Sequence, residues 1–222
     1  MDYRTITVGI EGAVATITLN RPEKRNAIST ELRDELEAAL AELKSGDAVR
    51  VIRLRGAGPG FCSGYDLTST TSVYSGVADA PPVDRSAGRP PLSGFGESTA
   101  MRDRERLRES IERWLALWNY PKPIIAQVHG VCLAGALDLI GVCDIVYAGE
   151  SAVFGHPAAR GLGIPPTLGL LPLKIGPAAT KELFFTGDTI GAAEAYRLGL
   201  VSRVVPDDQL DAVTMAFCRR VS

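Results

Sequence analysis

Hydrophobic and polar residues alternate with a period of two at the start of the chain. Residues 5–10 and 13–19 both show this pattern, and Glu11-Gly12 separates them. Successive side chains of a strand point to opposite faces, so the pattern predicts an opening β-hairpin. Residues 49–55 favour another strand, because apolar and β-branched residues lead there into a glycine- and proline-rich break at residues 56–60.

A helical spacing of leucines follows the hairpin. Leu32, Leu36, Leu40 and Leu43 recur every three or four residues, which places them on one face of a helix. Ser29 stands directly before this run, and serine is a preferred N-cap. These residues predict a helix over 29–44.

Helical and strand patterns then alternate along the chain. Residues 104–118 and 134–141 favour helices, residues 124–128 and 144–148 favour strands, and residues 208–220 are amphipathic. Such alternation predicts an α/β fold with a parallel sheet and helices packed outside it. Residues 68–100 are rich in Ser, Thr, Gly and Pro and poor in apolar residues, so they predict a flexible surface loop.

The composition is that of one ordinary domain. The chain has 222 residues, of which 45% are hydrophobic and 23% charged, and its net charge is −2. Charges of both signs are interspersed, so neither a nucleic acid nor a membrane surface is expected as a partner. The Arg/Glu run at 102–113 predicts a solvated helix face. Without a signal-peptide core or an apolar run near the roughly 20 residues that span a bilayer, a cytoplasmic protein is predicted.

The four cysteines have no metal-ligand spacing, which favours reduced, buried thiols and no metal site. Residues 60–64, Gly-Phe-Cys-Ser-Gly, do mimic a nucleophile elbow around Cys62, for which His129 or His156 would have to serve as the base. Outside a strand-turn-helix with a full triad, that motif is weak. The buried thiol is therefore the favoured interpretation.

Two stretches, residues 60–67 and 129–138, each end a strand in a glycine-rich turn. A helix that starts after such a turn leaves backbone N–H groups without a partner. Two turns placed face to face can aim two donors at one oxygen. That arrangement stabilises the oxyanion of an enolate formed from a thioester.

Five segments resemble, in order and spacing, the crotonase (enoyl-CoA hydratase/isomerase) superfamily. They are residues 20–28, 61–67, 130–138, 143–148 and 154–157. The resemblance covers essentially the whole chain. It implies the ClpP/crotonase type of α/β fold, a spiral of ββα turns with outer helices, although no internal repeat is visible in the sequence. Residues 1–205 would form this core, and residues 206–222 would begin a C-terminal helical region.

By this resemblance the substrate is an acyl-CoA thioester, and no separate cofactor is implied. The oxyanion donors would be the backbone N–H groups of Tyr65 and Gly135, and Asp138 would lie one turn further along the helix as the acid/base. The 68–100 loop would line the acyl pocket. Asp66 is also suited to bracing its own turn, and Lys24 and Arg25 to being solvated loop charges. The residues expected to contact coenzyme A are Lys24, Arg25, Ala27, Ser63, Asp66, Leu67, Leu133 and Pro157.

The chain departs from the family at the second catalytic carboxylate. That position aligns with Ala158, which cannot exchange a proton, so the two-carboxylate addition of water is not expected. His156 is a candidate replacement, because its ordinary pKa is near 6.5. Arg160 is a candidate for binding a polar acyl group.

The function expected is therefore that of an isomerase, racemase, lyase or atypical hydratase in fatty acid metabolism. A non-catalytic acyl-CoA binding protein is the alternative. A peptidase of the ClpP type would need a Ser/His/Asp set that the chain does not present recognisably. The resemblance also implies a homotrimer or hexamer, which the family builds with helices beyond the position of Ser222.

Overall fold

Six strands form the main sheet, in the order β1-β2-β3-β4-β6-β9, in a computed structural model that describes residues 2–66, 97–162 and 166–222. The first pair is antiparallel, and all the other neighbouring pairs are parallel. The strands are β1 (Ile6–Glu11), β2 (Val14–Leu19), β3 (Val51–Gly56), β4 (Ile124–Val128), β6 (Ile145–Gly149) and β9 (Arg203–Val205).

The predicted hairpin is confirmed as β1 and β2, with Glu11 paired to Val14 across the turn. Gly12 in this turn has a φ of +57°, which glycine adopts without steric penalty. β3 and β4 lie inside the sheet and are buried on both faces, as parallel strands covered by helices usually are. That double burial explains why residues 124–128 are an apolar run rather than an alternation.

A second, three-stranded sheet has the order β5-β7-β8 and consists of β5 (Val131–Leu133), β7 (Val153–Gly155) and β8 (Thr189–Gly191). Parallel bridges from Cys62 to Cys132 and from Ile28 to Tyr65 extend it. Successive stretches of chain thus give one strand to the main sheet, a short piece to the second sheet, and then a helix. This is the predicted spiral of ββα turns, and the repeat lies in the backbone path rather than in the residues.

The helices cover this framework as expected of an α/β fold. Those following the 3₁₀ turn η1 (Pro22–Lys24) are α1 (Thr30–Lys44), α3 (Glu97–Trp118), α4 (Gly135–Gly141), α5 (Pro157–Leu162), α6 (Leu171–Thr186), α7 (Ala192–Arg197) and α8 (Leu210–Val221). The predicted first helix is confirmed, since the Ser29 hydroxyl accepts from the Leu32 N–H and caps α1. Leu32, Leu36 and Leu40 are buried, and such side chains each contribute about 1.5–3 kcal/mol.

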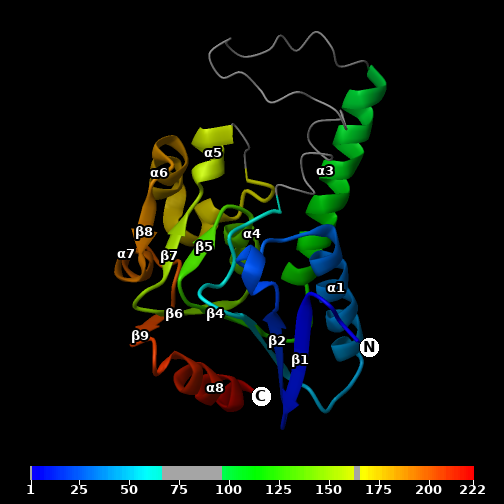
Figure 1. The fold of residues 1–222 in the computed structure, drawn as a ribbon, viewed down its shortest axis with the longest axis vertical. Helices are drawn as coiled ribbons and strands as arrows, with labels where there is room; N and C mark the ends of the chain where they lie inside the picture. The colour runs from blue at the N-terminus through cyan, green and yellow to red at the C-terminus, as the bar shows by residue number, and fades with distance from the viewer. Residues whose placement is uncertain (1, 67–96, 163–165) are drawn as a thin grey trace.

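The long helix α3 lies beside α1 (Figure 1) and begins at Glu97 rather than at the predicted residue 104. Among the side chains that the structure describes, the prediction of a solvated Arg/Glu face is wrong at Arg113. Arg108 does pair with Glu112 on the exposed surface, but Arg113 pairs with Asp34 and Glu37 of α1. These ion pairs join the two helices. The loop predicted over 68–100 is wrong at its end, because residues 97–100 already belong to α3. Leu67 and residues 68–96 lie outside the described part of the chain.

The C-terminal helix α8 lies on the face of the main sheet opposite the other helices (Figure 1). Its Met215 and Cys218 belong to a small apolar cluster with Val14, Val51 and Ile125, which confirms the amphipathic pattern predicted there. No helix in the described residues is both long enough and apolar enough to cross a membrane.

Candidate active site

The two glycine-rich turns predicted from the sequence lie against each other. A Cβ added to Gly64 would stand 2.7 Å from the Leu133 carbonyl oxygen and 3.1 Å from the Gly135 nitrogen. A Cβ added to Gly135 would stand 2.5 Å from Cε2 of Tyr65. At Gly64 the backbone leaves no room for a side chain, and at Gly135 the Tyr65 ring would have to move to admit one. The Gly64–Tyr65 turn therefore packs directly on the start of α4.

Hydrogen bonds that extend the second sheet from β5 to Cys62 hold this junction in place. The Cys62 N–H donates to Val131, and the Leu133 N–H donates back to Cys62. Ala134 then takes a φ of +50°, which is unusual for a residue with a Cβ, while its N–H donates to the Gly155 carbonyl. The chain enters α4 at Gly135 through this constrained turn.

The Gly135 N–H is one of the first-turn groups that a helix cannot satisfy internally. Within residues 2–66, 97–162 and 166–222 it donates to no protein acceptor. A donor of this kind is available to an oxygen of a bound molecule.

Asp138 is buried one turn inside α4, where its carboxylate is held by backbone groups. The Thr167 N–H donates to Oδ2 at 3.1 Å, and the Leu168 N–H donates to Oδ1 at 3.2 Å. Burial raises the pKa of this carboxyl from its usual 3.8 to about 6, and the hydrogen bonds from residues 167 and 168 and from Tyr65 oppose that rise. A carboxylate with this pKa is mostly ionised at neutral pH and can both accept and return a proton.

Residues 21–28, which precede the first turn along the chain, form a compact segment bonded to that turn, which we call the clasp. Arg21 donates to the Ala27 carbonyl at 2.6 Å and forms an ion pair of 2.9 Å with Asp66. Asp66 is buried, and its N–H donates to Ile28. Asp66 therefore braces the turn, which is the alternative that the sequence favoured for it.

Asn26 is the centre of this clasp, and the sequence interpretation gave it no role. It is fully buried, and its amide nitrogen lies 2.8–3.1 Å from the carbonyl oxygens of Ala57, Gly60 and Phe61. Its φ of +54° is one that asparagine tolerates better than most residues. The asparagine thus ties the segment at 21–28 to the turn that leads to Tyr65.

We expect Asn26→Ala to lower the free energy of unfolding by about 2–4 kcal/mol, because it leaves buried carbonyls without a donor and adds strain at a positive φ. Urea unfolding followed by circular dichroism measures this. Asn119→Ala is the matched control, since that exposed side chain donates only to the Leu115 carbonyl in the preceding helix α3. Equal midpoints for the two variants would contradict the assigned role.

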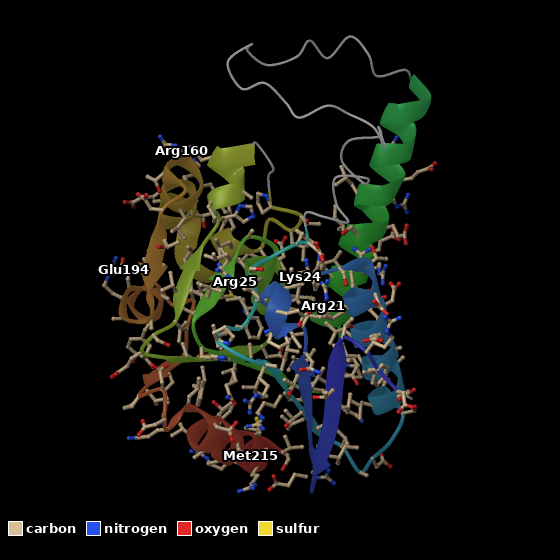
Figure 2. All side chains as sticks on the ribbon, viewed as in Figure 1. Arg21, Lys24, Arg25, Arg160, Glu194 and Met215 are labelled. Carbon is tan, nitrogen blue, oxygen red and sulfur yellow. The ribbon has the colours of Figure 1, made fainter. Side chains whose placement is uncertain are left out.

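Only some of the residues expected to contact coenzyme A lie at this clasp. Lys24 and Arg25 are exposed at η1 and just after it (Figure 2), and the Arg25 carbonyl accepts from the Ser63 N–H at 3.0 Å. Ala27 is buried, and Leu133 is half-buried in β5. Pro157 is exposed at the start of α5, and Leu67 lies outside the described residues.

His156 and Arg160 are not joined to Asp138 by any hydrogen bond or ion pair in the described part of the chain. His156 is buried edge-on against Phe184, with 5.0 Å between ring centroids, and its Nδ1 has no partner there. Burial lowers its pKa, so the ring is neutral at neutral pH. Arg160 is exposed, donates to the Thr186 carbonyl, and stands apart from Lys24 and Arg25 (Figure 2).

The Cys62 thiol lacks the chemistry of a nucleophile. It is fully buried, and burial raises its pKa to about 12. A thiolate is the reactive form, so almost none is present at neutral pH. His129, one of the two possible bases, instead contacts the Gly58 carbonyl through Nε2 at 2.8 Å.

Three side chains that the sequence did not single out form a hydrogen-bonded chain next to Asp138. They are the phenol of Tyr65, the indole of Trp114 and the hydroxyl of Thr167. Trp114 falls on the buried face of α3, where a core residue is the ordinary interpretation. Thr167 has no local pattern around it. Tyr65 was considered only for its backbone N–H.

Comparisons with known proteins identify the family and the fold. The family model for enoyl-CoA hydratase/isomerase matches residues 9–80 and 92–222. The chain is 40% identical to EchA13 of Mycobacterium tuberculosis, a protein named as an enoyl-CoA hydratase, over 99% of this chain and 68% of that protein. It is 33% identical to the peroxisomal Δ(3,5)-Δ(2,4)-dienoyl-CoA isomerase of Arabidopsis thaliana, over 91% of this chain and 70% of that protein. A crystal structure of an enoyl-CoA hydratase/isomerase from Xanthobacter autotrophicus matches with a TM-score of 0.82 at 34% identity, covering 99% of this chain and 74% of that one.

Proposed function

Since the chain belongs to the enoyl-CoA hydratase/isomerase family, we propose that it is an enzyme that stabilises the enolate of an acyl-CoA thioester between the N–H groups of Tyr65 and Gly135. The observation that carries this proposal is the packing of the Gly64–Tyr65 turn on the Gly135 nitrogen, at the entrance to α4. Two backbone donors on turns that pack against each other suit one developing oxyanion.

Asp138 is the acid/base of the proposed reaction. It takes a proton from the α or γ carbon of the acyl group and returns it to carbon, while the backbone donors hold the charge on the thioester oxygen. Its raised pKa suits both steps near neutral pH. Isomerisation, racemisation or an atypical lyase or hydratase reaction all need this proton transfer.

The clasp around Asn26 supports a binding role for its exposed basic residues. Lys24 and Arg25 extend from a backbone that is bonded to the Ser63 turn. We assign them to the phosphates of coenzyme A, which basic side chains bind well. The homotrimer or hexamer and the cytoplasmic location stay predictions.

The direct test of the proposed function is exchange of acyl α-protons in deuterated water. Butyryl-CoA, 3-butenoyl-CoA and phenylacetyl-CoA form a suitable panel, because each carries α-protons on a saturated carbon, and ¹H NMR is the readout. We expect exchange on at least one thioester, because enolate formation precedes every product considered. Binding of all three without exchange would favour the non-catalytic acyl-CoA binding protein.

We expect hydration of crotonyl-CoA to be feeble, because the half-buried Ala158 of α5 supplies no second carboxylate. Ala158→Glu is expected to raise the hydration rate about tenfold or more. Ala159→Glu places the same group one residue further along α5 and is the control. The absorbance of the enoyl thioester follows the reaction. Robust hydration by the natural sequence would contradict this prediction and make His156 the first residue to replace.

A further inference from the structure

The phenol of Tyr65 joins three separate parts of the chain around Asp138. Its oxygen lies 2.9 Å from Nε1 of Trp114 in α3 and 2.9 Å from Oγ1 of Thr167, ahead of α6. It lies 3.5 Å from Oδ2 of Asp138 in α4. The side chain thus reaches the carboxylate from the same residue whose backbone forms the first turn.

The direction of these hydrogen bonds follows from donor chemistry. An indole N–H can only donate, so the Tyr65 oxygen accepts from Trp114. The phenolic proton can then point to Thr167 or to Asp138. These two acceptors belong to one hydrogen-bonded group, because the Thr167 N–H itself donates to Oδ2 of Asp138.

The aromatic ring of Tyr65 is also fixed in position, by its packing on Gly135. A Cβ on Gly135 would overlap its Cδ2 and Cε2 atoms, at 2.6 and 2.5 Å. The ring therefore fills the space above the Gly135 Cα. Any shift of the turn against α4 moves the phenol relative to Asp138.

We propose that Tyr65 is a positioning residue for Asp138, whose phenolic O–H, oriented by Trp114, keeps the buried carboxylate ionised and fixed beside the oxyanion turn. This inference rests on the proposed function of the site. One residue then supplies a backbone donor at the thioester and a side-chain donor at the base. The oxyanion turn and the acid/base group are coupled through a single ring.

The charge environment of Asp138 makes this donor important. In the described residues, no cation forms an ion pair with Asp138, and the titratable side chain bonded to it is Tyr65. The other donors come from Thr167 and Leu168, which do not titrate. A buried carboxylate without a cation stays charged only through its hydrogen-bond donors.

Tyr65→Phe tests the inference, because it keeps the ring over Gly135 and removes the O–H alone. The pKa of Asp138 is measured by ¹³C NMR on protein with labelled aspartate side chains, and Asp138→Asn identifies its signal. We expect the pKa of Asp138 to rise by roughly half a unit to one unit in Tyr65→Phe, since a bond to the charged form is lost. Trp114→Phe removes the N–H that orients the phenol. It should raise the pKa of Asp138 less than Tyr65→Phe does.

Tyr120→Phe is the matched control, because that phenol donates to the Leu40 carbonyl away from the site. An unchanged or lowered pKa in Tyr65→Phe would overturn the inference, and would leave Tyr65 as a packing residue. This titration needs no substrate, so it decides the matter even for a protein without activity.

Exchange of α-protons separates this inference from the proposed function. In Tyr65→Phe we expect the acid limb of the pH profile of exchange to move to higher pH by as much as the pKa of Asp138 rises. The affinity for acyl-CoA should change little. If exchange occurs but the acid limb of Tyr65→Phe does not move, the role of Tyr65 is overturned and the proposed function stands. A shifted pKa without exchange on any thioester would overturn the proposed function alone.

Discussion

Asp138→Asn is expected to lower α-proton exchange by about 10²-fold or more, while the affinity for acyl-CoA survives. The amide keeps the size of the side chain but cannot take a proton. Deuterium incorporation measured beside isothermal titration of the same thioester separates the two effects. Exchange retained within about threefold of the natural protein would remove Asp138 from the chemistry.

Asp138→Asn should also change how the free energy of unfolding depends on pH, in a direction that the pKa of Asp138 determines. The folded state of the natural protein binds the Asp138 proton more tightly than the unfolded state does, because the pKa rises from 3.8 to about 6. The stability from this proton is therefore greatest at acid pH and is lost as the pH rises through about 6. Between pH 7 and pH 4 the natural protein should gain about 2 kcal/mol relative to Asp138→Asn. Urea unfolding at the two pH values checks this, and a constant difference would contradict the burial of a charged carboxylate.

The second large effect is expected at Gly135. Comparing proline with alanine at this position separates the loss of the N–H donor from the addition of a Cβ. Both substitutions add a Cβ against the Tyr65 ring, but only proline removes the N–H. Gly135→Pro should therefore exchange α-protons about 10²–10³-fold more slowly than Gly135→Ala, the usual loss for one oxyanion donor. Both variants are compared at saturating thioester.

Gly141→Ala is the control for the helix, because its Cβ would meet only Leu170, at 3.9 Å. It should leave exchange unchanged. Circular dichroism must show that Gly135→Pro is folded, since Ala134 before it holds a φ of +50°. A folded Gly135→Pro protein as active as Gly135→Ala would discard the Gly135 N–H as an oxyanion donor.

Local patterns predicted most of the individual elements. The hairpin, the leucine face of α1, the buried run of β4 and the amphipathic α8 each depend on residues within a few positions of one another. Periods of two and 3.6 report directly which face of such an element is buried. The start of α3 was placed too late, because residues 97–103 carry no apolar stripe that distinguishes a helix from the preceding loop.

The sequence by itself determined the α/β class, the family and the two glycine-rich turns, because short stretches of contiguous residues carry each of these patterns. Only the tertiary structure decided what surrounds them. Tyr65 reaches Trp114 across 49 positions, and Asp138 meets Thr167 across 29. Asn26 likewise bonds carbonyls more than 30 positions away. No periodicity encodes such contacts, because they exist only after the ββα turns have brought distant strand ends to one place.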